Sequence, residues 1–463
     1  MGKKKNNRIA VLLGYSVLIL FVLGIGLYLY KNTNIAEKIS YASFISSQQS
    51  QSLNSARRRS KYSFEAFEFA KGVGSIDDKG TGGNINVEAI GDLENRDRML
   101  AGTALGVATL VWDDKGGVQG QFELKEEMSY SKVFGVNRLG QIGVVQAPMD
   151  LKKEAISYLF DLNNPAITLE PSKGYSLRGD YIKSDKQEYF ETIVKQRGLS
   201  KDFPPLIFRD SEGKSLNNYG DVAGTQYVSE AISGGIVWLS SNQHEPIDLS
   251  ETIASQLGIH EGPGQQIYNI DDKKNIWANA RAKNKVVLGY FEYLEPNQWK
   301  LRQTWSHQDP SSTYTMLGAS NGNYAVVQEY NIVDFIINES SFVYQNRKVP
   351  RLFSSKPFLY RYKIEDYLKD VVDGKLEVFT IKSINNRNEI LALYATDKVI
   401  DSFIMNLDTK EIKLYSNLLK TGAIHLPDGY EFSPYAMSDD GSLYGSYRIG
   451  DSFYYYPGVL RKL

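Results

Sequence analysis

The nonapeptide LNNYGDVAG, Leu216 to Gly224, decides the fold of this chain because its pattern recurs along most of the sequence. An apolar residue is followed by three mostly polar residues, and the next place holds a turn residue, usually glycine. An apolar residue comes two places after the turn, and a small or apolar residue two places later. An Asn/Asp-x-x-Gly segment favours a tight turn in which glycine has a positive φ, and the alternation after it predicts a strand with one buried face.

Further copies of this nonapeptide lie on both sides of Leu216. They are LENRDRMLA at Leu93, VNRLGQIGV at Val136, YSLRGDYIK at Tyr175, IDDKKNIWA at Ile270, GASNGNYAV at Gly318, INNRNEILA at Ile384 and MSDDGSLYG at Met437. The predicted turn glycines are Gly140, Gly179, Gly220, Gly322 and Gly441. The clearer copies are followed by an apolar strand, a polar turn and another apolar strand. Four strands in each unit of about 40–55 residues are typical of a propeller blade, so we predict an all-β chain with a β-propeller of about seven blades, between six and eight.

The composition agrees with this prediction and narrows the function. The chain has 463 residues, with 31 Tyr and 39 Gly, and these residues suit pleated strands and tight turns. It has no cysteine, which excludes disulfides, thiolate metal sites and thiol catalysis. The net charge of -1 gives no electrostatic signature of nucleic-acid binding.

The copies at Leu216 and Ile384 carry a resemblance to a known family. With the strands that follow them, as in GIVWLSSNQHEPIDL and DSFIMNLDTKEIKLYSNLL, they resemble the HAF-type extracellular repeats of bacterial envelope and secreted proteins. The resemblance covers about residues 90–463, and it departs from the family pattern at Asp97, Lys274 and Asn388, which replace the turn glycine. It implies a propeller-like fold and an exported location, and no particular activity.

The two ends of the repeat region are predicted to pair with each other. The last copy is followed only by DSFYYYPGVLRKL, from Asp451, which is too short for the rest of a four-stranded blade. The segment YSFEAFEFA, from Tyr62 to Ala70, alternates aromatic with acidic residues and reads as a strand. We therefore expect it to complete the last blade and close the ring.

A membrane anchor is predicted before the repeats. Ile9 to Tyr30 is an uncharged stretch of 22 residues, long enough as a helix to cross the roughly 30 Å hydrocarbon core of a bilayer. The anchor residues that we single out are Ile9, Leu12, Leu18, Phe21, Leu27 and Tyr30. Residues 1–8 form a basic tail, which by the positive-inside rule stays in the cytoplasm. A cleaved signal peptide is disfavoured because the stretch is long and lacks an Ala-x-Ala site.

The predicted organisation is thus a cytoplasmic tail at 1–8, a transmembrane helix at 9–30, a Ser/Gln-rich tether at 31–60 and a repeat domain at 61–463. This places the bulk of the chain in the periplasm or at the cell exterior, tethered to the bacterial cytoplasmic membrane by one helix.

Motifs for chemistry are weak. The four histidines, His244, His260, His307 and His425, are too far apart in sequence for a zinc motif. Ser320 lies in a G-x-S-x-G string, but a strand-like segment follows it where a nucleophile elbow needs a helix. Paired aspartates before glycine read as hairpin turns. We therefore predict no cofactor and no metal, and we name no catalytic residue.

The sequence favours a non-enzymatic scaffold or recognition module of the cell envelope. Its expected partners are other envelope proteins or a glycan, in addition to the membrane, and no nucleic acid. An enzyme that binds or cleaves envelope polysaccharide stays open as the alternative, because the sequence does not show whether acidic side chains converge at the mouth of the channel.

Overall fold

The computed structural model describes residues 61–67, 85–94, 97–104, 108–125, 128, 130–147, 155–172, 210–229, 232–259, 264–282, 285–306, 313–331, 340–346, 358–452 and 454–463. The chain separates into two compact units, Met1–Arg58 and Arg59–Leu463, and the fold below is that of the second unit. The predicted anchor and tether, and the predicted turn at Gly179, lie outside the described residues. Within the described ranges, no helix has the length and apolar character needed to cross a bilayer.

Antiparallel meanders of four strands account for nearly all the regular structure. The described strands form six sheets, of which four have four strands, one has five and one has eight. The eight-stranded sheet consists of two meanders joined only by a parallel bridge between Ser233 and Gly264. The described part of the chain therefore contains seven meanders, which follow one another in sequence.

The first meander consists of β2 (Ile85–Asp92), β3 (Arg98–Ala104), β4 (Ala108–Asp113) and β5 (Val118–Glu123). The second consists of β6 (Tyr130–Val136), β7 (Gln141–Ala147), β8 (Ile156–Asp161) and β9 (Ile167–Leu169). The third consists of β10 (Asp210–Leu216), β11 (Val222–Ser229), β12 (Ile232–Trp238) and β13 (Pro246–Asp248). The next three are β14 (Gly264–Ile270), β15 (Ile276–Ala282), β16 (Lys285–Leu294) and β17 (Gln298–Trp305); β18 (Thr313–Ser320), β19 (Tyr324–Asn331), β20 (Ser340–Asn346) and β21 (Phe358–Lys363); and β22 (Leu376–Ile384), β23 (Glu389–Thr396), β24 (Ile400–Asn406) and β25 (Ile412–Leu414).

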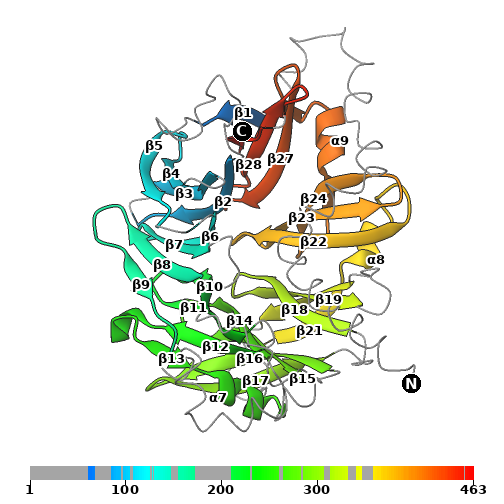
Figure 1. The fold of residues 1–463 in the computed structure, drawn as a ribbon. Helices are drawn as coiled ribbons and strands as arrows, with labels where there is room; N and C mark the ends of the chain where they lie inside the picture. The colour runs from blue at the N-terminus through cyan, green and yellow to red at the C-terminus, as the bar shows by residue number, and fades with distance from the viewer. Residues whose placement is uncertain are drawn as a thin grey trace, which may run out of the picture. The chain divides into compact units, whose positions relative to one another are not determined.

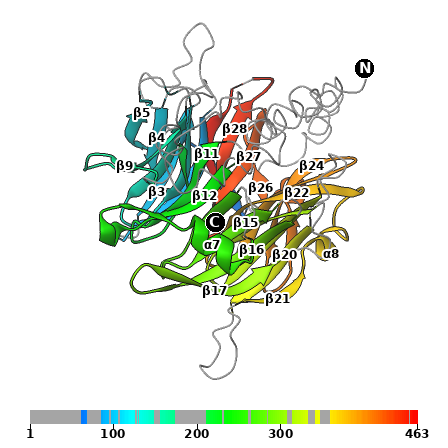
Figure 2. The ribbon, with the colours of Figure 1, turned by 60° about the horizontal axis from the view of Figure 1, so that its bottom comes forward.

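The last meander combines β27 (Tyr430–Met437), β28 (Leu443–Ile449) and β29 (Tyr456–Lys462) with β1 (Tyr62–Ala66), and β26 (Ile424–His425) adds a fifth strand. The described helices are short: η2 (Ser240–Asn242), α7 (Ser250–Gln256), α8 (Glu365–Leu368) and α9 (Tyr415–Lys420). Figure 2 shows α7 beside the strands of the third and fourth meanders, where it contacts β12 and β15.

The meanders form a closed, propeller-like ring. The first strand of each meander (β2, β6, β10, β14, β18, β22 and β27) contacts the first strand of the next, and β27 contacts β2 again. Figure 1 shows the sheets following one another from the blue β2 to the red β27. Apolar residues fill the space between neighbouring sheets; for example, one cluster joins Val111 of β4 to Val144 of β7. The predicted all-β, propeller-like architecture is confirmed.

The ring is closed by the N-terminal strand. β1 pairs antiparallel with β29, with Phe64 opposite Leu460, and Figure 1 shows it beside the red C-terminal strands. The Phe64 ring packs edge-on against Tyr430 and Tyr447, at centroid distances of 5.6 and 5.1 Å. The predicted pairing between the two ends of the repeat region is therefore confirmed.

Every first strand carries a β-bulge at one place in its pairing with the second strand. The residues skipped in the register are Glu88, Phe134, Lys214, Tyr268, Gly318, Lys382 and Tyr435. In three meanders a glycine of the second strand faces the bulge: a Cβ on Gly102, Gly224 or Gly445 would overlap a carbonyl oxygen of the first strand. In the copies at Leu216 and Met437 this glycine is the last residue of the nonapeptide, and Gly102 directly follows the copy at Leu93, so close backbone approach requires a glycine at these places.

Removal of β1 should destabilise the whole ring. A chain that lacks residues 1–67 exposes the edge of β29 and loses the buried Tyr62 and Phe67 side chains, worth about 2–3 kcal/mol each. We expect it to unfold at a clearly lower temperature, by differential scanning calorimetry, than a matched chain that lacks only residues 1–60. Equal melting temperatures of the two chains would contradict closure by β1.

Candidate functional site

The recurrent nonapeptide forms the turn between the first and second strands of each meander. The described turns are 137–141, 217–221, 271–275, 321–324, 385–389 and 438–442, together with residues 93, 94 and 97 of the first turn, and we call the surface they form the turn face. In a typical turn, the N–H of Asn217 donates to the carbonyl of Asp221 at 3.0 Å, and the N–H of Gly220 donates back to the carbonyl of Asn217 at 3.2 Å. Five other turns repeat the first of these bonds.

The first residue of a turn organises the turn through its side chain. The Asn217 side-chain oxygen accepts the N–H groups of Tyr219 and Asp221, both at 2.9 Å. The same two bonds recur at Asn137, Asp271 and Asn385. The Asn217 amide also donates to the carboxylate of Asp221 at 2.9 Å. Each of these turns is therefore closed by side-chain hydrogen bonds as well as by its backbone.

The same amide also connects one turn to the next. Asn137 Nδ2 donates to the carbonyl of Asn217 at 3.1 Å, and Asn217 Nδ2 donates to the carbonyl of Asp271 at 2.9 Å. On the other side of the ring, Asn321 Nδ2 donates to the carbonyl of Asn385 at 2.7 Å, and Asn385 Nδ2 to that of Ser438 at 3.0 Å. These bonds form an amide relay that holds consecutive turns side by side.

The second residue of a turn adds a further contact between meanders. Asn218 donates through its backbone N–H and its side-chain amide to the two carboxylate oxygens of Asp272, at 2.9 and 3.0 Å. Asn386 and Asp439 make the same pair of bonds, both at 2.7 Å.

The fourth place of most turns has the backbone conformation that glycine favours. Gly140, Gly220 and Gly441 hold this place with φ values of 80, 84 and 90°, and Gly322, the second residue of its shorter turn, has a φ of 81°. Lys274 and Asn388, which replace glycine, adopt the same region with φ of 64 and 61°. Asparagine tolerates this region, whereas lysine is strained there. The departures at Lys274 and Asn388 therefore do not change the turn. Asp97 is instead the fifth residue of its turn, where its carbonyl accepts the N–H of Leu93, so the copy at Leu93 is shifted by one place.

The copy at Gly318 has a different register from the one that the sequence suggested. Ser320 pairs with Ala325, so the turn contains four residues, and its first residue is Asn321. The Asn321 oxygen accepts the N–H of Tyr324 at 2.9 Å, as the first residue does elsewhere. Ser320, the serine of the G-x-S-x-G string, ends β18 and donates its hydroxyl to the carbonyl of Tyr324 at 3.0 Å, within a hairpin and not before a helix.

An ionic cluster takes the place of the amide where the last meander meets the first. Arg98, whose side chain is 13% exposed, contacts Asp92, Asp114 and Asp440 at 2.8, 3.4 and 3.1 Å. It also donates to the Tyr444 hydroxyl at 2.7 Å. Burial disfavours the charge of Asp440, but hydrogen bonds from Ser438 and Ser442 and then the charge of Arg98 lower its pKa well below the usual range.

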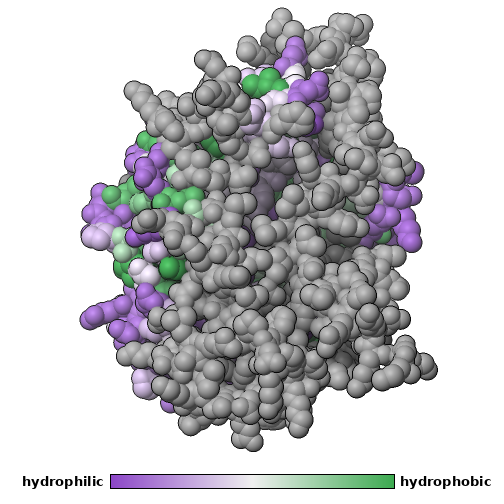
Figure 3. All heavy atoms as spheres, viewed as in Figure 1, coloured by the Kyte–Doolittle hydropathy of each residue, from purple (hydrophilic) through white to green (hydrophobic). Residues whose placement is uncertain are grey.

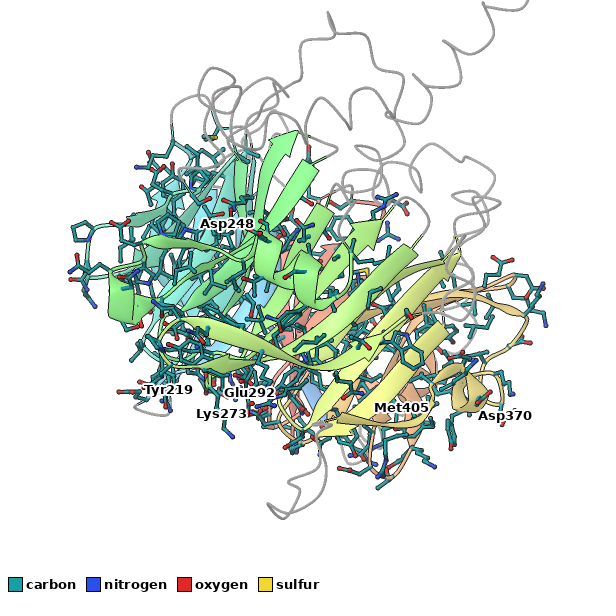
Figure 4. The ribbon with its side chains drawn as sticks, turned by 90° about the horizontal axis from the view of Figure 1, so that it is seen from below. Tyr219, Asp248, Lys273, Glu292, Asp370 and Met405 are labelled. Carbon is teal, nitrogen blue, oxygen red and sulfur yellow. The ribbon has the colours of Figure 1, made fainter. Side chains whose placement is uncertain are left out.

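The third residue of the five-residue turns faces solvent. Leu139 is 48% exposed and Tyr219 is 51% exposed, and Lys273, Arg387 and Asp440 are exposed at the same place. By contrast, the first residue is buried at Asn137, Asn217, Asn385 and Ser438. Figure 4 shows Tyr219 and Lys273 projecting near each other, with Glu292 close by. The turn face thus combines locked turns with outward side chains that differ from turn to turn.

Arg138 of one turn and Tyr219 of the next form a patch on the turn face that is both basic and aromatic. The Arg138 guanidinium lies 4.9 Å from the centre of the Tyr219 ring, so the two side chains hold each other in place. Leu139 precedes Gly140 in the same turn as Arg138. Apolar, aromatic and basic groups therefore meet at the junction of the second and third meanders.

Other residues considered in the sequence have structural contacts. His244 Nε2 lies 2.8 Å from the carbonyl oxygen of Gly220, and the exposed His425 is in β26; His260 and His307 lie outside the described residues. Trp112, Trp238, Trp277 and Trp299 are all less than 5% exposed. The sequence emphasised the turn glycines and missed the Asn, Asp or Ser three places earlier, although that position was visible in most copies.

Comparisons with known proteins give distant structural similarities. No family model and no curated protein matches the chain. Among solved structures, the Myceliophteria thermophila Cps50 (Swd1) beta-propeller domain has a TM-score of 0.37 and 10% identity, over 71% of this chain and 82% of that one. Oligopeptidase B from Trypanosoma brucei has a TM-score of 0.40 and 8% identity, over 78% of this chain and 44% of that one. Prolyl oligopeptidase B from Galerina marginata has a TM-score of 0.41 and 8% identity, over 83% of this chain and 52% of that one.

The amide relay should be measurable in one turn. Asn217→Ala removes one bond of the relay and leaves the N–H groups of Tyr219 and Asp221 without the Asn217 oxygen, so we expect a loss of about 2–4 kcal/mol in urea unfolding. The exchange Asn217→Asp with Asp221→Asn copies the arrangement of Asp271 and Asn275, restores the bond within the turn and removes only the bond to Asp271. It should cost about 1 kcal/mol.

Asn386→Ala is the matched control, because Asn386 is exposed and its partner Asp439 lies near the surface. We expect a change within about 0.5 kcal/mol for this variant. If Asn217→Ala were no more destabilising than Asn386→Ala, the relay would have no structural importance.

Proposed function

We propose that this chain is a seven-bladed β-propeller, anchored in the bacterial cytoplasmic membrane by residues 9–30, that acts as a recognition module of the cell envelope. The turn face is the surface that binds the partner, and the partner is another envelope protein. The exported location follows the HAF-type resemblance and the basic tail at residues 1–8.

The seven meanders and their closed order of contacts support the blade count. Each meander then corresponds to one blade. β1 is the outermost antiparallel strand of the last blade, and the short β26 pairs with its free edge.

The pattern of burial within the turns carries the functional proposal. The first residue of a turn is held by hydrogen bonds, whereas the third residue is exposed and differs in chemistry from turn to turn. A rigid backbone that presents varied side chains loses little conformational entropy on binding. Loops held by a rigid scaffold are the usual place for recognition residues.

The chemistry of the patch at Arg138, Leu139 and Tyr219 favours a protein partner. Tyr and Arg are the residues that most often dominate binding energy in protein interfaces, where they are surrounded by apolar contacts. Two large apolar side chains exposed on neighbouring turns gain binding energy when a partner covers them. The part of the surface coloured in Figure 3, in the region of β5, β8 and β9, instead mixes hydrophobic and hydrophilic residues.

Partner binding should depend on the turn face. The full chain with Leu139→Asp and Tyr219→Ala should recover at least about tenfold less of a partner protein, in affinity purification from detergent-solubilised native membranes, than the unaltered chain. Ile167→Asp is the control, since Ile167 is 38% exposed on the outer strand β9. Equal recovery of the same protein with all three chains would contradict the proposal.

The anchor has its own test. The full chain should remain in the membrane pellet after alkaline carbonate extraction, because a transmembrane helix resists a treatment that removes peripheral proteins. A chain that lacks residues 2–30 should be recovered in the soluble fraction. Release of the full chain by carbonate, or retention of the shortened chain in the pellet, would contradict anchoring by residues 9–30.

A further inference from the structure

Charged residues of successive first strands interact along the inner side of the ring. We call Glu88, Lys132, Glu212, Lys214, Lys382 and Tyr435 the inner cluster; they come from β2, β6, β10, β22 and β27. These strands lie at the ends of their sheets, so one edge of each has no strand paired to it. Four of the six residues, Glu88, Lys214, Lys382 and Tyr435, are the bulged residues of their strands. A bulge turns a side chain away from the direction it would have in regular pairing.

Lys132 is the key member of the inner cluster. It is exposed, although its neighbours Ser131 and Val133 are 7% and 3% exposed. Glu88, the carboxylate that attracts it, is already bound by the Val133 N–H at 2.6 Å and by the Thr103 hydroxyl at 2.9 Å. Within the described part of the chain, the Lys132 ammonium has no carboxylate within 4.0 Å.

Lys214 provides a second ammonium on the neighbouring first strand. β6 contacts β10, and Gly213, next to Lys214, lies against the ring of Phe134, two residues from Lys132. The Lys214 Nζ lies 2.5 Å from Glu212, and 28% of its side chain is exposed, so solvent reaches it. Burial lowers the pKa of Lys214, and the charge of Lys132 lowers it further against the attraction of Glu212. Two ammonium groups thus repel each other at a recessed position, with Glu212 paired to only one of them.

Glu88, one of the two carboxylates of the cluster, is half-buried. Burial raises the pKa of Glu88, so its charge is disfavoured there. The Tyr435 side chain is 41% exposed. Partial burial, and then the charge of Glu88, raises the pKa of its hydroxyl. The Lys382 ammonium lies 5.1 Å from the centre of the Tyr435 ring. The positive charge of the cluster is therefore incompletely neutralised, and lysines outnumber carboxylates.

We propose that Lys132 and Lys214 form a binding site for a small anion that bears a carboxylate or phosphate group, inside the ring and separate from the turn face. An anion between the two ammonium groups removes their repulsion and supplies Lys132 with the acceptor that it lacks among the described residues. A cation is disfavoured, because both exposed groups at this position are themselves positive. A charge-assisted hydrogen bond to a carboxylate or phosphate is among the stronger polar contacts in proteins.

The first experiment measures thermal stability of the purified full chain at constant ionic strength. The added salts are sodium phosphate, as the phosphate arm, and sodium galacturonate, as the carboxylate arm, each against sodium chloride. At concentrations far above the dissociation constant, at least one anion should raise the melting temperature by about 3 °C relative to chloride. The arm that gives the rise identifies which of the two groups the site prefers.

Lys132→Met should abolish this rise, whereas Lys398→Met should keep it. Lys398 is an exposed lysine that pairs with Asp373 at 2.7 Å, so it controls for loss of one positive charge. The proposal is overturned if neither anion stabilises the unaltered chain, or if Lys132→Met and Lys398→Met respond alike.

A second measurement detects the site directly. NMR titration of Lys214, with ¹³C-methylated lysines, should show its pKa rising when the stabilising anion is added, because the anion favours the charged ammonium. In the Lys132→Met variant, the pKa of Lys214 should be higher without anion, since one source of repulsion is gone, and it should no longer respond to anion. An anion response that persists in this variant would place the anion elsewhere.

Discussion

The ring depends on one hydrogen-bonding group, the side-chain amide of the first turn residue. A meander of four strands has two faces and cannot bury both by itself, so each sheet needs a neighbour on either side. First strands approach one another most closely at the inside of the ring, where their unpaired edges leave few backbone bonds to hold them. The amide of Asn217 satisfies its own turn with its oxygen and the next turn with its nitrogen. Four hydrogen bonds of one buried side chain therefore fix both the local turn and the spacing between blades.

A second constraint is space. The bulges in the first strands bring the backbone close to the second strand, and Gly102, Gly224 and Gly445 face the carbonyl oxygens of Asn86, Glu212 and Ser433 there. The residues near the start of the nonapeptide and the small residue at its end therefore both act in the hairpin between the first and second strands. The second place of the nonapeptide carries the amide, its fifth place allows a positive φ, and its last place allows close approach. These three requirements leave the third turn residue free to vary. The side chain of that residue is the one that the turn face exposes to solvent.

Much of the fold could be predicted from the sequence because its determinants are local and repeated. Hairpin turns, strand alternation and the missing fourth strand of the last blade are all visible within segments of about ten residues. The copy at Gly318 was aligned wrongly, because Gly322 fits the pattern even though the turn is one residue shorter and begins at Asn321. The inner cluster could not be predicted, since Lys132 and Lys214 are distant in sequence and their proximity depends on the order of blades.

The relay is not continuous, and the interruptions follow from chemistry. Asp271 is the first residue of its turn, and a carboxylate can only accept, so within the described residues it sends no hydrogen bond to the next turn. The junction between the fourth and fifth meanders is instead apolar, with Trp277 of β15 packed in one cluster with Leu317 of β18 and Val327 of β19. The junction between the seventh and first meanders has the ionic cluster of Arg98. The amides therefore join two arcs of the ring, one from the second meander to the fourth and one from the fifth to the seventh. Packing joins the two arcs to each other, and the Arg98 cluster joins the seventh meander to the first. Apolar packing carries no charge for salt to screen, whereas the attraction of Asp92, Asp114 and Asp440 for Arg98 weakens as the ionic strength rises. The seam between the last meander and the first is thus held by ion pairs, whereas amide hydrogen bonds and apolar packing run through the junctions from the second meander to the seventh.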